Sequence, residues 1–206
     1  MPTKLSWFSA TQVHDYLNGF KIFPDYLDCE RFSNFSMCYD QVIVDYESGA
    51  NNVLVVASPN FPSAGKGLIS DRVQAMVPGN EIPYWGELFV HKFEESNIMN
   101  LKMKKKFAER LVELPVQPFL GVGICLYVLG SLSCVATYSN DAQFNGWGKP
   151  PKENSRLENN CHLWCYELEK MESFEALVNW LKKCPLWLVV NKKIKYGEEM
   201  LTKYFD

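Results

Sequence analysis

An uncharged run of 18 residues, from Phe119 to Ala136, limits the folds open to this chain more than any other feature. The run reaches the lower limit of length for a membrane-spanning helix, and the basic sequence KMKKK precedes it at residues 102–106. Its three glycines weaken the prediction of a helix, because glycine has a low helix propensity. The alternative is a segment buried in the core of a soluble protein. The run by itself leaves both interpretations open.

The composition of the whole chain is typical of a globular protein, with 47% hydrophobic and 22% charged residues. A length of 206 residues suits one domain with a real hydrophobic core. The formal net charge of −3 and the isoelectric point near 5.7 argue against bulk nucleic-acid binding, which needs a basic surface.

Seven cysteines at irregular spacings, and no charged-then-apolar signal segment, favour a reducing intracellular compartment, the nucleus or the cytoplasm. Cys161, His162 and Cys165 could form part of a zinc site. A structural zinc site takes four ligands, however, and no second close pair is present. We therefore expect buried or free thiols and no metal.

Periodic patterns predict a mixed α+β fold with many short strands and a few peripheral helices. Val13, Tyr16 and Phe20 have the spacing of an N-terminal helix, and two β-branched runs within residues 40–58 predict a hairpin. Residues 100–114 predict a surface helix that ends before Pro115. Further expected elements are a long loop at residues 146–160, a strand within 161–168, a helix within 171–184 and a strand within 185–194.

Three separated motifs carry the functional signal. Residues 63–88 read SAGKGLISDRVQAMVPGNEIPYWGEL, a glycine-containing turn, two strands around a Pro-Gly turn, and a Tyr-Trp-Gly-Glu end. Residues 194–204 read IKYGEEMLTKY, and between these two motifs lie TYSNDAQFNG at 137–146 and NNCHLW at 159–164. Each motif alone is weak evidence, because a tight turn between strands is the commoner explanation of a glycine pair.

Taken together and in this order, the motifs resemble those of SET-domain protein lysine methyltransferases, over roughly Val53 to Tyr204. In this resemblance, TYSNDAQFNG and NNCHLW correspond to a split form of the family's Asn-His-Ser-Cys motif, with Asn-Asp replacing Asn-His. The resemblance implies a SET-type fold of several small sheets with a C-terminal pseudoknot and peripheral helices. It also implies that residues 51–206 form the catalytic domain and that residues 1–50 are an N-terminal elaboration packed on it. Within the catalytic domain, an insert is expected near residues 89–135 and a loop near residues 143–159.

The resemblance further implies S-adenosyl-L-methionine as cofactor and a protein lysine, such as one on a histone tail, as substrate. The implied catalytic residues are Tyr204 and Tyr84, and Tyr84 would line the channel that admits the substrate lysine. Asn160 would lie where the chain is threaded through the pseudoknot and would close that part of the structure. The implied cofactor-binding residues are Ala64, Gly65, Lys66, Gly67, Asn140 and Asp141.

The same resemblance favours the buried interpretation of the uncharged run. If residues 119–136 crossed a bilayer, Gly67 and Asn140 would lie on opposite sides of it, yet both would have to contact one cofactor. No membrane partner is expected, nucleic acid would be met only indirectly on a nucleosome, and a monomer is preferred.

Several residues also have ordinary interpretations. Tyr84 and Tyr204 suit packing, Asp141 suits a turn, and Glu198 and Glu199 suit a solvated pair after a turn. The chain departs from the family in having Asp141 instead of histidine and no cysteine-rich module after Tyr204. A catalytically silent SET-like module that binds other proteins therefore remains the alternative to an enzyme.

Overall fold

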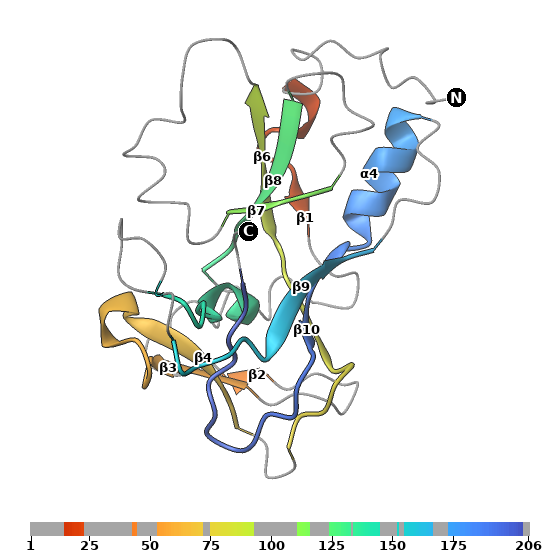
Figure 1. The fold of residues 1–206 in the computed structure, drawn as a ribbon. Coiled ribbons are helices and arrows are strands. Elements are labelled where there is room, and N and C mark those ends of the chain that lie inside the picture. The colour runs from red at the N-terminus through yellow and green to blue at the C-terminus, as the bar shows by residue number, and fades with distance from the viewer. Residues whose placement is uncertain are drawn as a thin grey trace. The chain divides into compact units, whose positions relative to one another are not determined.

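The computed structural model describes residues 15–22, 43–44, 53–71, 75–92, 111–115, 124–132, 134–144, 152, 155–166 and 173–203 (Figure 1). The chain divides into two compact units, and each unit is assembled from separate stretches of sequence. The first unit comprises Met1–Asp28, Trp85–Ser131 and Cys165–Leu186, and the second comprises Cys29–Tyr84, Leu132–Trp164 and Trp187–Asp206. The predicted insert near residues 89–135 thus falls mainly in the first unit.

The first unit contains a four-stranded antiparallel sheet. Its strands, in spatial order, are β1 (Lys21–Ile22), β6 (Gly86–Lys92), β8 (Ile124–Gly130) and β7 (Leu111–Glu113) (Figure 1). Leu88 pairs with Val128 and Val90 pairs with Leu126, and all four side chains are buried. Because side chains two residues apart share one face of a strand, these pairs form the core face of this sheet.

Strand β8 decides between the two interpretations of the uncharged run. Most of the described residues of this run form β8 and the beginning of a short 3-10 helix, Val135–Tyr138. Within the described part of the chain, no helix has both the length and the apolar character needed to span a membrane. The expected buried core segment is confirmed at Cys125, Leu126 and Val128.

Two helix predictions in this unit need correction. Residues 111–113 form strand β7, so the helix predicted over 100–114 is wrong there, and residues 100–110 lie outside the described residues. Leu111 and Leu114 are buried, as the helical pattern also required, but pairing with β8 decides the backbone conformation. At the N-terminus, residues 15–17 are helical, but Tyr16 is 66% exposed and Leu17 is buried, so the predicted apolar face is wrong.

Helix α4 (Phe174–Lys182) confirms the helix predicted within residues 171–184. Ser173 is its N-cap, and its hydroxyl accepts a hydrogen bond from the Ala176 N–H at 3.1 Å. Leu177 and Leu181, four residues apart on one helix face, are fully buried.

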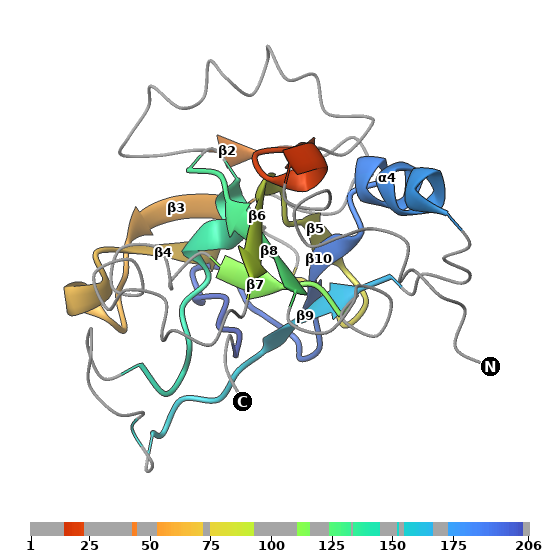
Figure 2. The same ribbon diagram turned by 90° about the horizontal axis from the view of Figure 1, so that it is seen from above.

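The second unit contains a sheet of order β2-β3-β4, and the hairpin predicted within residues 40–58 is confirmed by the antiparallel pairing of β2 with β3 (Figure 2). A further sheet of order β5-β10-β9 includes the two strands predicted within residues 161–168 and 185–194. The strands of these two sheets are β2 (Ile43–Val44), β3 (Val53–Ala57), β4 (Lys66–Ser70), β5 (Glu81–Pro83), β9 (Cys161–Cys165) and β10 (Leu186–Val190). Small antiparallel sheets with few helices agree with the expected α+β class.

Residues 194–202 follow β10 and make single bridges to distant parts of the second unit. Glu199 bridges Ile69 of β4 in antiparallel fashion, whereas Leu201 and Thr202 bridge Asn140 and Cys161 in parallel fashion. The C-terminal segment is therefore hydrogen-bonded to three chain segments that are far apart in the sequence. This arrangement determines where the motif residues meet.

Candidate functional site

A buried carboxylate lies at the meeting point of the motifs. Glu199 is 4% exposed, and its Oε1 atom accepts hydrogen bonds from Ser58 Oγ at 2.7 Å and Asn140 Nδ2 at 2.8 Å. Its Oε2 atom accepts from Asn60 Nδ2 at 2.9 Å and from the Asn60 N–H at 3.3 Å. Burial of a charged group requires such compensation. The expectation that Glu198 and Glu199 form a solvated pair is wrong for Glu199, while Glu198 is exposed.

Asn140 joins all three sequence motifs. Besides the bond to Glu199, its Nδ2 atom donates to the Lys66 carbonyl at 3.0 Å. One side-chain amide thus connects the glycine-containing turn, the Asn-Asp motif and the C-terminal Gly-Glu-Glu motif. Asn140 lies 74 positions from Lys66 and 59 positions from Glu199 in the sequence.

The close approach of Glu199 explains why position 67 is glycine. A Cβ atom on Gly67 would lie 2.2 Å from Glu199 Oε1 and 3.1 Å from Ser58 Cβ, so any side chain would displace the carboxylate. Position 65 is glycine for a different reason, because its backbone φ of +86° lies in the left-handed region that favours glycine. The space next to Gly67 is thus filled by a group of the protein itself.

The backbone of the predicted cofactor turn is largely bonded within the protein. The Gly65 N–H donates to the Pro62 carbonyl at 3.2 Å, and the Gly65 carbonyl accepts from the Ser58 N–H at 3.0 Å. The Ala64 N–H donates to the Phe61 carbonyl at 2.8 Å. These bonds fix the turn in one conformation.

Asp141 has the ordinary role of aspartate after a turn. Its Oδ1 atom accepts a hydrogen bond from the Gln143 N–H at 2.9 Å, which closes a local turn. Its side chain is partly exposed. The contacts of Asp141 therefore fit a turn, and Asn140 carries the longer-range bonds.

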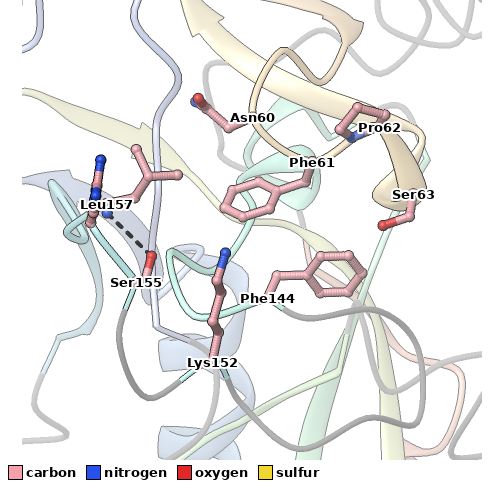
Figure 3. A pocket seen from close by; sticks show the side chains of 9 residues that line it. Asn60, Phe61, Pro62, Ser63, Phe144, Lys152, Ser155 and Leu157 are labelled. Atoms are coloured by element: carbon pink, nitrogen blue, oxygen red, sulfur yellow. Dashed lines mark hydrogen bonds between the residues drawn. The ribbon is translucent and has the colours of Figure 1, made fainter.

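A pocket of about 420 Å³ opens beside this network (Figure 3). Residues 60–63 form one wall, and Phe144, Lys152 and residues 155–157 form the other. The rings of Phe61 and Phe144 meet edge to face, with centroids 5.8 Å apart. Such a volume and a mixed polar and aromatic lining are common in small-molecule sites.

Asn60 connects the pocket to the buried network, because it lines the pocket and also bonds to Glu199. Phe61 belongs to a hydrophobic cluster with Ala142 and Leu201, against which Ala64 also packs. None of the six predicted cofactor-binding residues lines the pocket itself. Ala64–Gly67 directly follow the wall formed by residues 60–63, and Asn140 and Asp141 shortly precede Phe144 of the other wall.

The two predicted catalytic tyrosines are placed differently. Tyr84 is fully buried and directly follows β5, and Tyr204 lies outside the described residues. Thr202, two residues before Tyr204, is fully buried, and its hydroxyl has no hydrogen-bond partner among the described residues. Asn160 binds the backbone of the C-terminal segment, donating to the Glu199 carbonyl at 2.9 Å and accepting from the Leu201 N–H at 2.8 Å.

Cys161 and Cys165, part of the possible metal motif, are held in the thiol form. Burial raises the pKa of each thiol to about 12. Metals bind the thiolate, which a raised pKa disfavours. Among the residues that the structure describes, no three His, Cys, Asp or Glu side chains are grouped to hold a metal ion.

Comparison with known proteins adds no relative: the chain matches no protein-family model, and a search of curated proteins gives no significant match.

Sequence reasoning missed Ser58, Asn60 and Glu199 as parts of the site. A signal for the first two was present, since Ser58-Pro59-Asn60 directly follows β3 and combines a turn with two hydrogen-bonding side chains. Glu199 gave no such signal, because adjacent glutamates after a turn are usually solvated.

Proposed function

We propose that this protein is an S-adenosyl-L-methionine-dependent protein lysine N-methyltransferase with a SET-type fold. One observation carries the proposal: the Asn140 amide binds both the Lys66 carbonyl and the Glu199 carboxylate. The three motifs on which the family resemblance rests therefore meet at one point. This convergence of the motifs supports the proposal.

The threaded C-terminus of the SET-type fold is part of this proposal. Its support is the parallel bridging of Leu201 to Asn140 and of Thr202 to Cys161, while Glu199 bridges Ile69 on β4. A segment that bonds to three separate chain segments is what a C-terminal pseudoknot requires, and such threading is an exception among protein connections.

The residues present fit a cofactor at the pocket between residues 60–63 and Phe144. Its volume is in the usual range for small molecules, and its lining combines the aromatic rings of Phe61 and Phe144 with the polar side chains of Asn60 and Ser63. When bound, S-adenosylmethionine supplies a methyl group on a positively charged sulfur. The pocket residues and the neighbouring Ala64–Gly67 and Asn140–Asp141 segments would hold it.

The protein itself contributes mainly by aligning the substrate lysine with the methyl group. Methyl transfer to an amine is an in-line displacement, so positioning of a neutral lysine nitrogen contributes most of the catalysis. Buried surroundings lower the pKa of a lysine and so favour the neutral amine. Tyr84, fully buried, would stand at the solvent-excluded inner end of the lysine channel, and Tyr204 would orient the amine. The substrate would be a protein lysine, such as one on a histone tail, in the nucleus or cytoplasm.

The silent interaction module remains a second candidate, and one observation favours it. The Glu199 carboxylate already occupies the space beside Gly67, so the fold by itself explains this glycine without any cofactor. Cofactor binding and methyl transfer distinguish the two candidates.

The test measures incorporation of labelled methyl groups from S-adenosylmethionine into histones and a cell-lysate protein pool. We expect activity in the wild type and a loss of roughly 30- to 1000-fold in Tyr204→Phe, because a hydroxyl that acts mainly in the transition state is removed. The matched control is Tyr196→Phe, since Tyr196 is 65% exposed and should lose nothing. An inactive wild type that also binds no cofactor would instead support the silent module.

A further inference from the structure

The pocket offers aromatic surface in a fixed position. Phe61 is 8% exposed and packs on Ala142 and Leu201, so its ring belongs to the core as well as to the pocket wall. Phe144 meets it edge to face, at 5.8 Å and 86°. Aromatic side chains held in this way suit a flat ring on the ligand.

Among the described residues that line the pocket, the charges have one sign. Of the nine lining residues, Lys152 and Arg156 are cations and none is a carboxylate. In Figure 3 the Lys152 side chain points into the pocket. The carboxylate of Glu199, behind Asn60, is buried and already accepts bonds from Ser58, Asn60 and Asn140.

Lys152 and Arg156 are also not paired with acids within the described part of the chain. The ion pairs there are Lys21–Glu87 and Lys192–Glu158. Both pocket cations are exposed, so water solvates them when no ligand is present. An anionic group that enters the pocket would thus meet two unneutralised positive charges.

The chain that carries these cations is attached to the site. The Lys152 N–H donates to the Gln143 carbonyl at 2.8 Å, and Ser155 Oγ donates to the Ala142 carbonyl at 2.6 Å. The Leu157 N–H then donates to Ser155 Oγ at 3.2 Å (Figure 3). Because Ala142 and Gln143 closely follow Asn140, these bonds hold Lys152 and Ser155 close in the fold to the network at Asn140.

We propose that this pocket binds a ligand in which a flat ring is joined to a negatively charged group, and that Lys152 and Arg156 bind the charged group. That the ligand is the methyl donor, with the carboxylate of its methionine part as the anion, rests on the proposed function. An adenine nucleotide would present the same chemistry through its phosphate. The preference for an anionic ligand does not depend on the proposed function, because it is argued only from Lys152 and Arg156 in the pocket.

The experiment compares two ligands that share the adenosine thioether but differ at the charged end. S-adenosylhomocysteine carries the amino-acid carboxylate, and 5′-methylthioadenosine carries no charge. By calorimetric titration, Lys152→Gln and Arg156→Gln should each weaken S-adenosylhomocysteine binding by about 3- to 10-fold and leave methylthioadenosine binding within about 2-fold. Lys152→Arg should retain most of the affinity, and Lys193→Gln, at an exposed lysine outside the pocket, should change neither ligand.

Each outcome decides something different. Equal losses for both ligands, or no loss for either, would overturn the anion-binding role while leaving the proposed function in place. If neither S-adenosylhomocysteine nor S-adenosylmethionine binds but adenosine monophosphate does, with the same dependence on Lys152 and Arg156, the proposed function fails and the anion site stands. If none of these ligands binds at millimolar concentration, both proposals are wrong.

Discussion

Two adjacent carboxylates, Glu198 and Glu199, have opposite surroundings. The Glu198 side chain is exposed and accepts a hydrogen bond from the Lys195 N–H at 2.7 Å, which closes the turn at Gly197. The Glu199 side chain is buried and accepts four hydrogen bonds from groups on two other segments. The sequence predicted the turn but not this difference, because the partners of Glu199 lie about 60 to 140 positions away.

This contrast provides a matched pair of substitutions. Glu199→Gln keeps the size of the side chain but replaces one acceptor oxygen by an NH₂ group that faces hydrogen-bond donors. We expect a loss of about 1–3 kcal/mol in the free energy of unfolding, because buried donors are left without an acceptor. Glu198→Gln should change it by no more than about 0.5 kcal/mol. Urea unfolding measures both, and equal effects of the two variants would contradict the assigned role of Glu199.

Among the elements, those with strong local signals were predicted correctly. Helix α4 has a Ser173 N-cap and an apolar face, and β10 is a short run of apolar and β-branched residues. Strand β7 was missed because Leu111 and Leu114 fit a helical period, whereas their pairing with β8 can be seen only in the folded chain. The wall of the pocket at Lys152 and residues 155–157 has no periodic pattern, so its position could not be predicted.

The C-terminal segment is the element on which the site depends, and Asn160 attaches it. Asn160→Ala removes the bonds to the Glu199 carbonyl and the Leu201 N–H, so two buried backbone groups lose their partners. We expect a destabilisation of about 2–4 kcal/mol by urea unfolding, together with weaker binding of any ligand of the pocket. Asn191→Ala, at an exposed asparagine, is the control and should have little effect. A stable Asn160→Ala variant with unchanged C-terminal protection in hydrogen exchange would refute this attachment.

At the scale of the whole molecule, the chain passes between its two units five times, after residues 28, 84, 131, 164 and 186. The motifs could be recognised in the sequence because each is short and continuous. The division into units could not, because each unit is assembled from separate stretches. The long-range hydrogen bonds among Ser58, Asn140 and Glu199 can form only after folding has brought these stretches together.

The stability of the whole chain should fall in alkaline solution, and Cys161 contributes to this fall. Cys161 is 1% exposed, and burial raises the pKa of its thiol from 9.0 to about 12. Above pH 9 the thiol of the unfolded chain loses its proton while the buried thiol keeps it, so a rise in pH favours unfolding. The stabilisation is complete below pH 9 and is lost progressively between pH 9 and pH 12.

Cys161→Val isolates this contribution, because valine is apolar, similar in size and does not titrate. Between pH 8 and pH 10 the wild type should lose about 1.4 kcal/mol more of its free energy of unfolding than the variant does. Urea unfolding at the two pH values, under reducing conditions, gives this difference directly. Any constant effect of the substitution on packing cancels, because each protein is compared with itself. The same loss in both proteins would mean that the Cys161 thiol ionises as readily in the folded chain as in the unfolded one, and that this strand is open to solvent.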